Sequence, residues 1–158
     1  MLAPLIVCLG VAWMALVLSA PFLPALPAAL TYAAASFICH QLPDRSFHSG
    51  TVQLPVCARC LGIYAGFAIG GLVAVGRRWR MGPQRARMVA AAGAVPTLVT
   101  VAAEWVGVWA TSNGMRFVAG LPLGAAIAFV VIGVLATLHY DECAPRRPIG
   151  HGQPPAST

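Results

Sequence analysis

The residues best suited to chemistry lie together in one stretch of the chain, residues 38–66 (ICHQLPDRSFHSGTVQLPVCARCLGIYAG). Cys57 and Cys60 have the Cys-x-x-Cys spacing of a metal knuckle, in which a tight turn directs two thiolates toward one ion. Cys39 lies upstream and adds a third sulfur. Such a set suits zinc or another thiolate-preferring metal, so the sequence predicts a metal site here.

Two histidines are candidates for a fourth ligand. His40 adjoins Cys39, and neighbouring side chains diverge by about 100° in a helix and alternate faces in a strand, which makes this pair awkward around one ion. His48 lies between the two cysteine clusters and is the alternative, leaving His40 as a catalytic residue for proton transfer. With only three protein ligands, the open position would hold a water that zinc can activate as a nucleophile.

A redox relay competes with the metal as the use of these cysteines. Membrane thiol oxidoreductases of the disulfide-bond-forming and vitamin K epoxide reductase kinds share the architecture of a small four-helix bundle with an outward Cys-x-x-Cys, and quinone would then be the cofactor. A relay normally needs a second cysteine pair, and Cys39 could act only as a resolving thiol. Three outward cysteines are an odd number, and an unpaired thiol is a liability in an oxidising compartment, which favours the metal. A structural zinc or a stapling disulfide is the non-catalytic alternative.

Charged and polar side chains near this stretch are candidates for substrate binding and proton transfer. Glu104 lies about 7 Å inside the end of an apolar run by the helical rise, where a carboxylate should face the bundle interior and pair with another group. Arg116 is the nearest partner, and a structural ion pair competes with a role as general base, with a pKa raised by burial. Guanidinium groups suit an anionic headgroup, phosphate or carboxylate, although surface snorkelling is their ordinary alternative. The predicted substrate-binding residues are Arg45, Arg59, Tyr64, Asn113 and Arg116.

The rest of the chain is composed for a membrane. Of its 158 residues, 59% are hydrophobic and 9% charged, against about 25% charged in a soluble domain. A helix needs about 20 apolar residues to cross ~30 Å of hydrocarbon. Four runs qualify, at 2–20, 57–76, 88–109 and 118–139. We therefore expect an all-α integral membrane bundle of about four transmembrane helices, a single domain over residues 1–140 with an outward-facing Cys/His loop.

Two segments do not fit a spanning helix. Three prolines interrupt 21–37, because proline removes a helical hydrogen bond, so we expect a bend and a short interfacial helix over about 28–41. The Pro/Gly-rich segment 141–158 is expected to be a disordered cytoplasmic tail.

The distribution of arginine predicts the orientation. Seven arginines lie in 77–87 and 146–147, against three at positions 45, 59 and 116. Arginine-rich loops stay in the cytoplasm, so both termini should be cytoplasmic and the Cys/His site extracytoplasmic, in a prokaryotic plasma (inner) membrane. This placement in short caps also argues against a nucleic-acid-binding surface.

Small residues predict which helices pack together. Gly62, Gly66 and Gly70 form one small-xxx-small ridge, and Gly120 and Gly124 form another. Such ridges let helix backbones approach closely in lipid. We expect the second and fourth spans to be neighbours, with the cysteines on the side away from the ridge.

Several motifs carry a resemblance to a known family. They are Cys39-His40-Gln41, Pro43-Asp44-Arg45-Ser46-Phe47, Val56-Cys57-Ala58-Arg59-Cys60 and Gly62-Ile63-Tyr64, followed by Asn113, Arg116, Gly120 and Gly124. Over about residues 37–125 the chain resembles small polytopic prokaryotic membrane proteins catalogued as domain of unknown function 2085. That family often has an acidic residue where Thr100 stands, and Glu104, one turn on, could substitute for it. The resemblance implies the membrane fold and the motif, but no reaction.

Three functions follow from these observations. The first is an integral membrane metalloprotein with a zinc-like Cys/His site at the outer membrane face, acting on a lipid-soluble or anionic substrate. The second is a quinone-coupled membrane thiol-disulfide oxidoreductase. The third is a small structural or assembly subunit of a membrane complex. Membrane lipid, a lipid-soluble substrate and membrane-complex subunits are the expected partners. The sequence alone leaves open whether the site is catalytic or structural.

Overall fold

The chain folds as a helical membrane bundle, as its composition predicts. The computed structural model describes residues 2–77 and 81–143, with side chains described as far as residue 138. In this part of the chain, four helical segments are long and apolar enough to cross a membrane: Leu2–Phe22, Ala58–Gly76, Pro83–Trp105 and Asn113–Leu138. The elements are α1 (Leu2–Ser19), α2 (Ala25–Ser36), β1 (Ser46–Ser49), β2 (Val52–Cys57), α3 (Ala58–Gly76), α4 (Pro83–Trp105) and α5 (Asn113–Cys143), with short 3-10 turns at Ala20–Phe22 and Pro43–Arg45.

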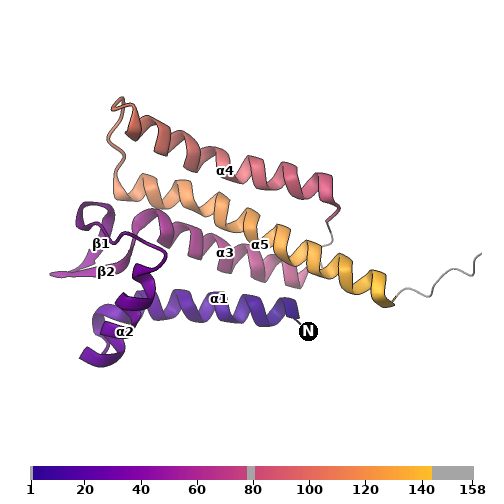
Figure 1. Cartoon of the computed structure of the whole chain (residues 1–158), viewed down its shortest axis with the longest axis horizontal. Coiled ribbons are helices and arrows are strands. Elements are labelled where there is room, and N and C mark those ends of the chain that lie inside the picture. The colour runs from indigo at the N-terminus through magenta and orange to yellow at the C-terminus, as the bar shows by residue number, and fades with distance from the viewer. Residues whose placement is uncertain (1, 78–80, 144–158) are drawn as a thin grey trace, which may run out of the picture.

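The helices lie in a row with α3 and α5 at its centre. α1 packs against α3, and α3 packs against α5. α4 packs against the side of α5 that faces away from α3 (Figure 1). The start of α1, the end of α3, the start of α4 and the C-terminal part of α5 lie at one end of the bundle (Figure 1). The hairpin β1–β2, α2 and the start of α5 lie at the opposite end. All predicted site residues therefore belong to one end of the molecule.

The glycine ridges form the contact between α3 and α5, as predicted. A Cβ atom added to Gly66 would overlap the carbonyl oxygen of Leu121, and one added to Gly124 would overlap that of Ile63. These helices touch through their backbones, because glycine leaves no side chain between them. Gly93 makes the corresponding close contact between α4 and α5, where an added Cβ would lie 2.7 Å from the carbonyl oxygen of Pro122.

The short helix before the site begins and ends earlier than the sequence predicted. α2 covers Ala25–Ser36 instead of 28–41. Pro24 is its N-cap, and Pro27 falls in the first turn, where no backbone N–H is needed for a helical bond. The chain leaves the helix after Ser36, so Cys39 and His40 lie in an irregular segment.

The segment expected to be a loop before α3 contains a β-hairpin. β1 pairs with β2 in antiparallel register, with Ser46 opposite Cys57 and His48 opposite Gln53. Gly50, at the turn, has a φ of 61°, a left-handed conformation that glycine adopts without steric cost. Leu54, Pro55 and Val56 are buried, so β2 anchors the hairpin on the bundle.

The third span also shifts toward the N-terminus, from the expected 88–109 to Pro83–Trp105. Pro83 begins α4 at a position where its missing N–H does not matter. The helix stops because Gly107 takes a φ of 72°; its N–H donates to the Glu104 carbonyl and that of Val108 to the Ala103 carbonyl. This is a Schellman cap, which ends a helix despite an apolar sequence beyond it. Residues 141–143 of the predicted disordered tail belong to α5, and the rest of the predicted tail, from 144 onward, lies outside the described residues.

Candidate metal centre

Three cysteines from separate parts of the chain form one cluster. The Sγ atoms of Cys39, Cys57 and Cys60 all lie within 4.8 Å of one another, and all three are free thiols. A tetrahedral zinc with Zn–S bonds of about 2.3 Å needs sulfurs about 3.8 Å apart. The cluster is therefore close to the arrangement that a thiolate-bound ion requires.

The start of α3 positions two of these sulfurs. Cys57 ends β2 and is the N-cap of α3, while Cys60 lies in the first helical turn. The backbone N–H of Cys57 donates a hydrogen bond to the Sγ of Cys39 at 3.1 Å. That bond uses a donor that the helix leaves unpaired at its N-terminus, and it ties the irregular segment to the helix.

The turn that carries Cys39 is held by two glutamines. Gln41 has a φ of 51°, which is uncommon for a residue with a side chain. Its Nε2 donates to the carbonyl oxygens of Tyr32 at 2.8 Å and Pro55 at 2.9 Å, and its own carbonyl accepts from Nε2 of Gln53 at 2.7 Å. Gln41 and Gln53 were not predicted as site residues. The Cys-His-Gln motif was the only signal for the first of them.

The environment of Cys57 favours its thiolate. A hydrogen bond from the Cys60 side chain lowers the pKa of Cys57 to about 5, against the opposing effect of burial. The backbone N–H groups of Cys60 and Arg59 and the Cys39 side chain lower it further. Thiolate is the form that binds metal and attacks disulfides, so Cys57 is prepared for either chemistry near neutral pH.

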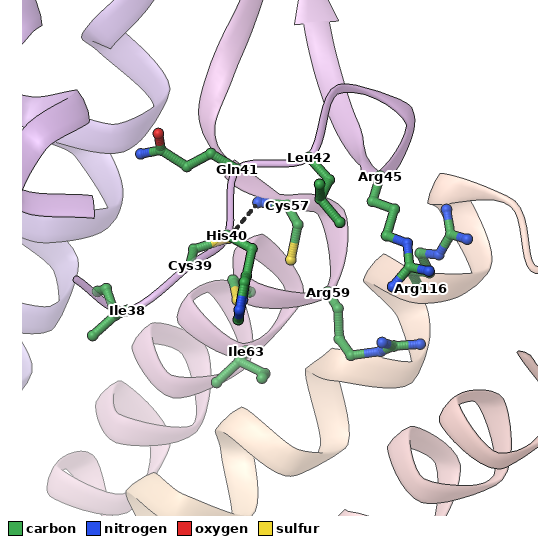
Figure 2. A pocket seen from close by; sticks show the side chains of 11 residues that line it. Ile38, Cys39, His40, Gln41, Leu42, Arg45, Cys57, Arg59, Ile63 and Arg116 are labelled. Atoms are coloured by element: carbon green, nitrogen blue, oxygen red, sulfur yellow. Dashed lines mark hydrogen bonds between the residues drawn. The ribbon is translucent and has the colours of Figure 1, made fainter. Parts of the chain in front are cut away.

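The two histidines have different positions. His40 lines a cavity next to the sulfurs, and Figure 2 shows its imidazole pointing into that cavity toward Ile63. His48 is exposed on β1 and is not one of the residues that line the cavity. Among the described residues, the three-sulfur group includes neither histidine.

The cavity joins the sulfurs to the predicted substrate-binding arginines. Its volume is about 360 Å³, and Figure 2 shows the arginine side chains gathered on one side and Cys39 and His40 on the other. It is lined by Ile38, Cys39, His40, Gln41, Leu42, Arg45, Cys57, Arg59, Cys60, Ile63 and Arg116. Thiols and cations thus share one small space.

Glu104 forms the ion pair that the sequence suggested. Its Oε1 accepts from Nε of Arg116 at 2.9 Å and from Nη2 of Arg59 at 3.5 Å. Glu104 does not line the cavity, so the carboxylate holds the two guanidinium groups from behind. Its role as a general base stays a prediction.

The remaining candidates lie beside the cavity and support it. Asn113 accepts from Nη1 of Arg116 at 2.9 Å and donates to the Ser46 carbonyl at 3.1 Å, which links α5 to β1. Tyr64 makes an edge-to-face contact with Trp13, with ring centroids 6.2 Å apart. Neither lines the cavity, so the structure brings the three arginines to the sulfurs but leaves these two outside.

A known protein family matches the part of the chain that contains the cysteine cluster and the arginines. Residues 39–130 match a family described as "Predicted membrane protein (DUF2085)". The chain belongs to this family. The match begins at Cys39 and continues into α5, so it includes the whole cysteine cluster and all three arginines.

Two archaeal proteins that are similar to this chain are described as uncharacterized proteins. One, from Methanocaldococcus jannaschii, is 27% identical over 121 residues, which cover 70% of this chain and 72% of the relative. The other, from Methanothermobacter thermautotrophicus, is 31% identical over 96 residues, or 58% of this chain and 82% of the relative. No solved structure matches the chain.

Proposed function

We propose that this protein is a membrane metalloprotein in which Cys39, Cys57 and Cys60 hold one zinc-like ion. The observation that carries the proposal is the convergence of three sulfurs, from the segment after α2, the end of β2 and the first turn of α3, within 4.8 Å. Three thiolates are a ligand set typical of zinc. The lowered pKa of Cys57 supports it, since metal binds the ionised thiol.

His40 is our candidate for the fourth ligand. It lines the same cavity as the sulfurs, whereas His48 does not. Without His40, a three-cysteine site would leave one coordination position for water or an anionic ligand. An open position of this kind is what distinguishes catalytic from closed structural zinc sites.

We place the site on the extracytoplasmic side of a prokaryotic plasma membrane. Arg77 caps the end of α3, and Arg85 and Arg87 belong to the start of α4; these helix ends lie opposite the hairpin and the start of α3 (Figure 1). The positive-inside tendency assigns that end to the cytoplasm. The cluster then meets an oxidising compartment, where binding a metal protects its odd number of thiols.

Metal analysis of anaerobically purified protein tests the proposal. We expect about one zinc per chain in the wild type and in Cys8→Ser, because Cys8 is exposed on α1 and is not part of the cluster. Cys57→Ser should lose the metal. Treatment with a chelator should expose three further thiols in the wild type. A metal-free wild type with Cys57 and Cys60 joined in a disulfide would contradict the metal site.

That contradictory result would support the second candidate, a quinone-coupled thiol oxidoreductase. The specific observation in its favour is the lowered pKa of Cys57 within a Cys-x-x-Cys pair at a helix N-terminus. Oxidation of the two thiols to a disulfide would transfer two electrons and two protons to quinone, giving quinol. Reduction of an added quinone by the dithiol form, and its loss in Cys60→Ser, would identify this activity.

A further inference from the structure

The cavity beside the cysteines has an excess of positive charge. Arg45, Arg59 and Arg116 line it, none of its lining residues is Asp or Glu, and the thiolate of Cys57 offsets only one of the three positive charges. Glu104 neutralises part of this charge from behind, through Arg59 and Arg116. Arg45 is exposed and lies in the turn before β1. It is separated from Arg59 and Arg116 in the sequence, and the fold brings the three side chains together. Glu104 carries one negative charge against Arg59 and Arg116, so an anion in the cavity would further reduce the repulsion among the three guanidinium groups.

The hydrogen bonds of these arginines leave donors for a ligand. Arg116 uses Nε on Glu104 and Nη1 on Asn113, out of the five N–H donors of a guanidinium group. Arg59 directs Nη2 to Glu104 and Thr100. Among the described residues, the buried Nε of Arg59 has no hydrogen-bond partner. A buried donor of this kind is rare in proteins and needs an acceptor.

We propose that this cavity binds the phosphate group of an anionic ligand through Arg45, Arg59 and Arg116. This inference rests on the proposed function in one respect, because it names the class of ligand that binds beside the proposed metal. Binding of the anion by the arginines themselves does not require the metal. Planar guanidinium groups bind phosphate and carboxylate in a bidentate way. Phosphate offers more acceptor oxygens and more charge than a carboxylate, which suits three cations converging from different segments.

The size and the rim of the cavity agree with a headgroup or a small phosphate. Its volume of about 360 Å³ is at the lower end of the ~300–1,000 Å³ usual for ligand sites. The apolar side chains of Ile38 and Leu42 line it while remaining 59% and 46% exposed. An apolar edge on a cationic cavity at the end of a membrane bundle suits the phosphate of a lipid, although free phosphate has the same chemistry.

Binding to purified protein in an uncharged detergent tests the proposal with two probes. The first is inorganic phosphate, and the second is phosphatidylglycerol in mixed micelles, with zwitterionic phosphatidylcholine as the lipid control. We expect Arg45→Gln to weaken binding of the recognised probe about tenfold, because hydrogen bonds to charged groups are worth roughly a factor of ten or more in affinity. Arg45 takes no part in the Glu104 pairs, so this variant should fold.

Two further variants make the result specific. Arg87→Gln is the matched control, since Arg87 is exposed on α4 at the opposite end of the bundle, and it should bind as the wild type does. Arg59→Lys keeps the charge but loses the planar fork, so its affinity should fall as well. Weaker binding of phosphatidylglycerol alone identifies a lipid headgroup, and weaker binding of inorganic phosphate identifies a free anion. Equal binding of both probes by Arg45→Gln and Arg87→Gln would overturn the proposal.

Zinc content measured on the same samples separates this inference from the proposed function. Arg45→Gln should retain its zinc, whereas Cys57→Ser should lose it. Arginine-dependent binding to a protein without zinc would refute the metal site and leave the anion site standing. Zinc retained without any arginine-dependent binding would support the metal site and refute the anion site.

Discussion

Gln41 shows how a single residue shapes the site. Its left-handed backbone, with a φ of 51°, turns the chain between the end of α2 and the hairpin. For a residue other than glycine this conformation costs about 1 kcal/mol or more. The two hydrogen bonds from its side chain and the one that its carbonyl accepts from Gln53 offset that cost. The turn places Cys39 against α3 and leaves His40 facing the cavity.

We therefore expect Gln41→Ala to damage the proposed metal site. The variant leaves the carbonyls of Tyr32 and Pro55 without their donor, which should lower the free energy of unfolding by about 1–3 kcal/mol. Denaturant unfolding in detergent micelles and zinc content measure the two effects. Gln84→Ala is the control, because Gln84 is exposed in the first turn of α4. Zinc bound as tightly by Gln41→Ala as by the control would show that the turn does not depend on this side chain.

Glu104 is the second residue whose replacement is informative. Glu104→Gln leaves two half-buried guanidinium groups without their counter-charge, and the free energy of unfolding should fall by about 2 kcal/mol. The double variant Glu104→Gln/Arg116→Gln should recover part of this loss, because one of the unpaired cations is removed as well. Zinc content should be unchanged, since Glu104 is not in the sulfur group. Unchanged stability would contradict a structural role for these ion pairs.

At the scale of elements, close packing of α3 against α5 fixes the site. A Cβ atom added to Gly120 would lie 2.5 Å from the carbonyl oxygen of Arg59 and 3.0 Å from the backbone N of Ile63. The start of α3 therefore cannot move without moving α5, which carries Arg116. Thr97 of α4 adds a hydrogen bond to the Ala119 carbonyl at 2.7 Å. The three helices hold Arg59, Cys60 and Arg116 at fixed positions.

Gly66→Ala tests this packing. The new methyl group would collide with the Leu121 carbonyl, and relieving the overlap should cost about 1–3 kcal/mol of stability. Gly76→Ala in the same helix is the matched control, since an added Cβ there meets nothing within 4 Å. Thermal unfolding in detergent compares the two variants. Equal midpoints would mean that the helices separate at little cost.

The sequence predicted some of these elements better than others, for physical reasons. The ridges of Gly62 and Gly124 were readable because close backbone contact requires a missing side chain at four-residue spacing. The end of α4 was not, because the cap at Gly107 stops the helix while apolar residues continue to 109. The hairpin was not predicted because strands of four and six residues give too little alternation of polar and apolar residues to be distinguished from a loop. Spacing alone also could not decide between His40 and His48, whose difference depends on the left-handed turn.

At the scale of the whole molecule, hydropathy and charge act together. The apolar helices are long enough for the chain to cross a membrane, and the distribution of arginine predicts the direction in which it does so. The hairpin and the start of α3 are at one end of the bundle, and the end of α3 and the start of α4 are at the other (Figure 1). Arg77 caps the end of α3, and Arg85 and Arg87 belong to the start of α4. The membrane family match agrees with the first of these inferences. The second needs its own measurement.

Epitope tags inserted after Gly50 and after Gly82 would establish the orientation. Both positions are exposed, and an added Cβ at either glycine meets nothing within 4 Å, so a tag should not disturb the bundle. In bacterial spheroplasts we expect the tag after Gly50 to bind antibody without permeabilisation, and the tag after Gly82 only after it. Replacing Arg77, Arg85 and Arg87 with glutamine should make the orientation mixed, because the charge bias is then reduced. The opposite labelling would put the three thiols in a reducing compartment, where their odd number no longer argues for a metal and zinc content alone would have to support the site.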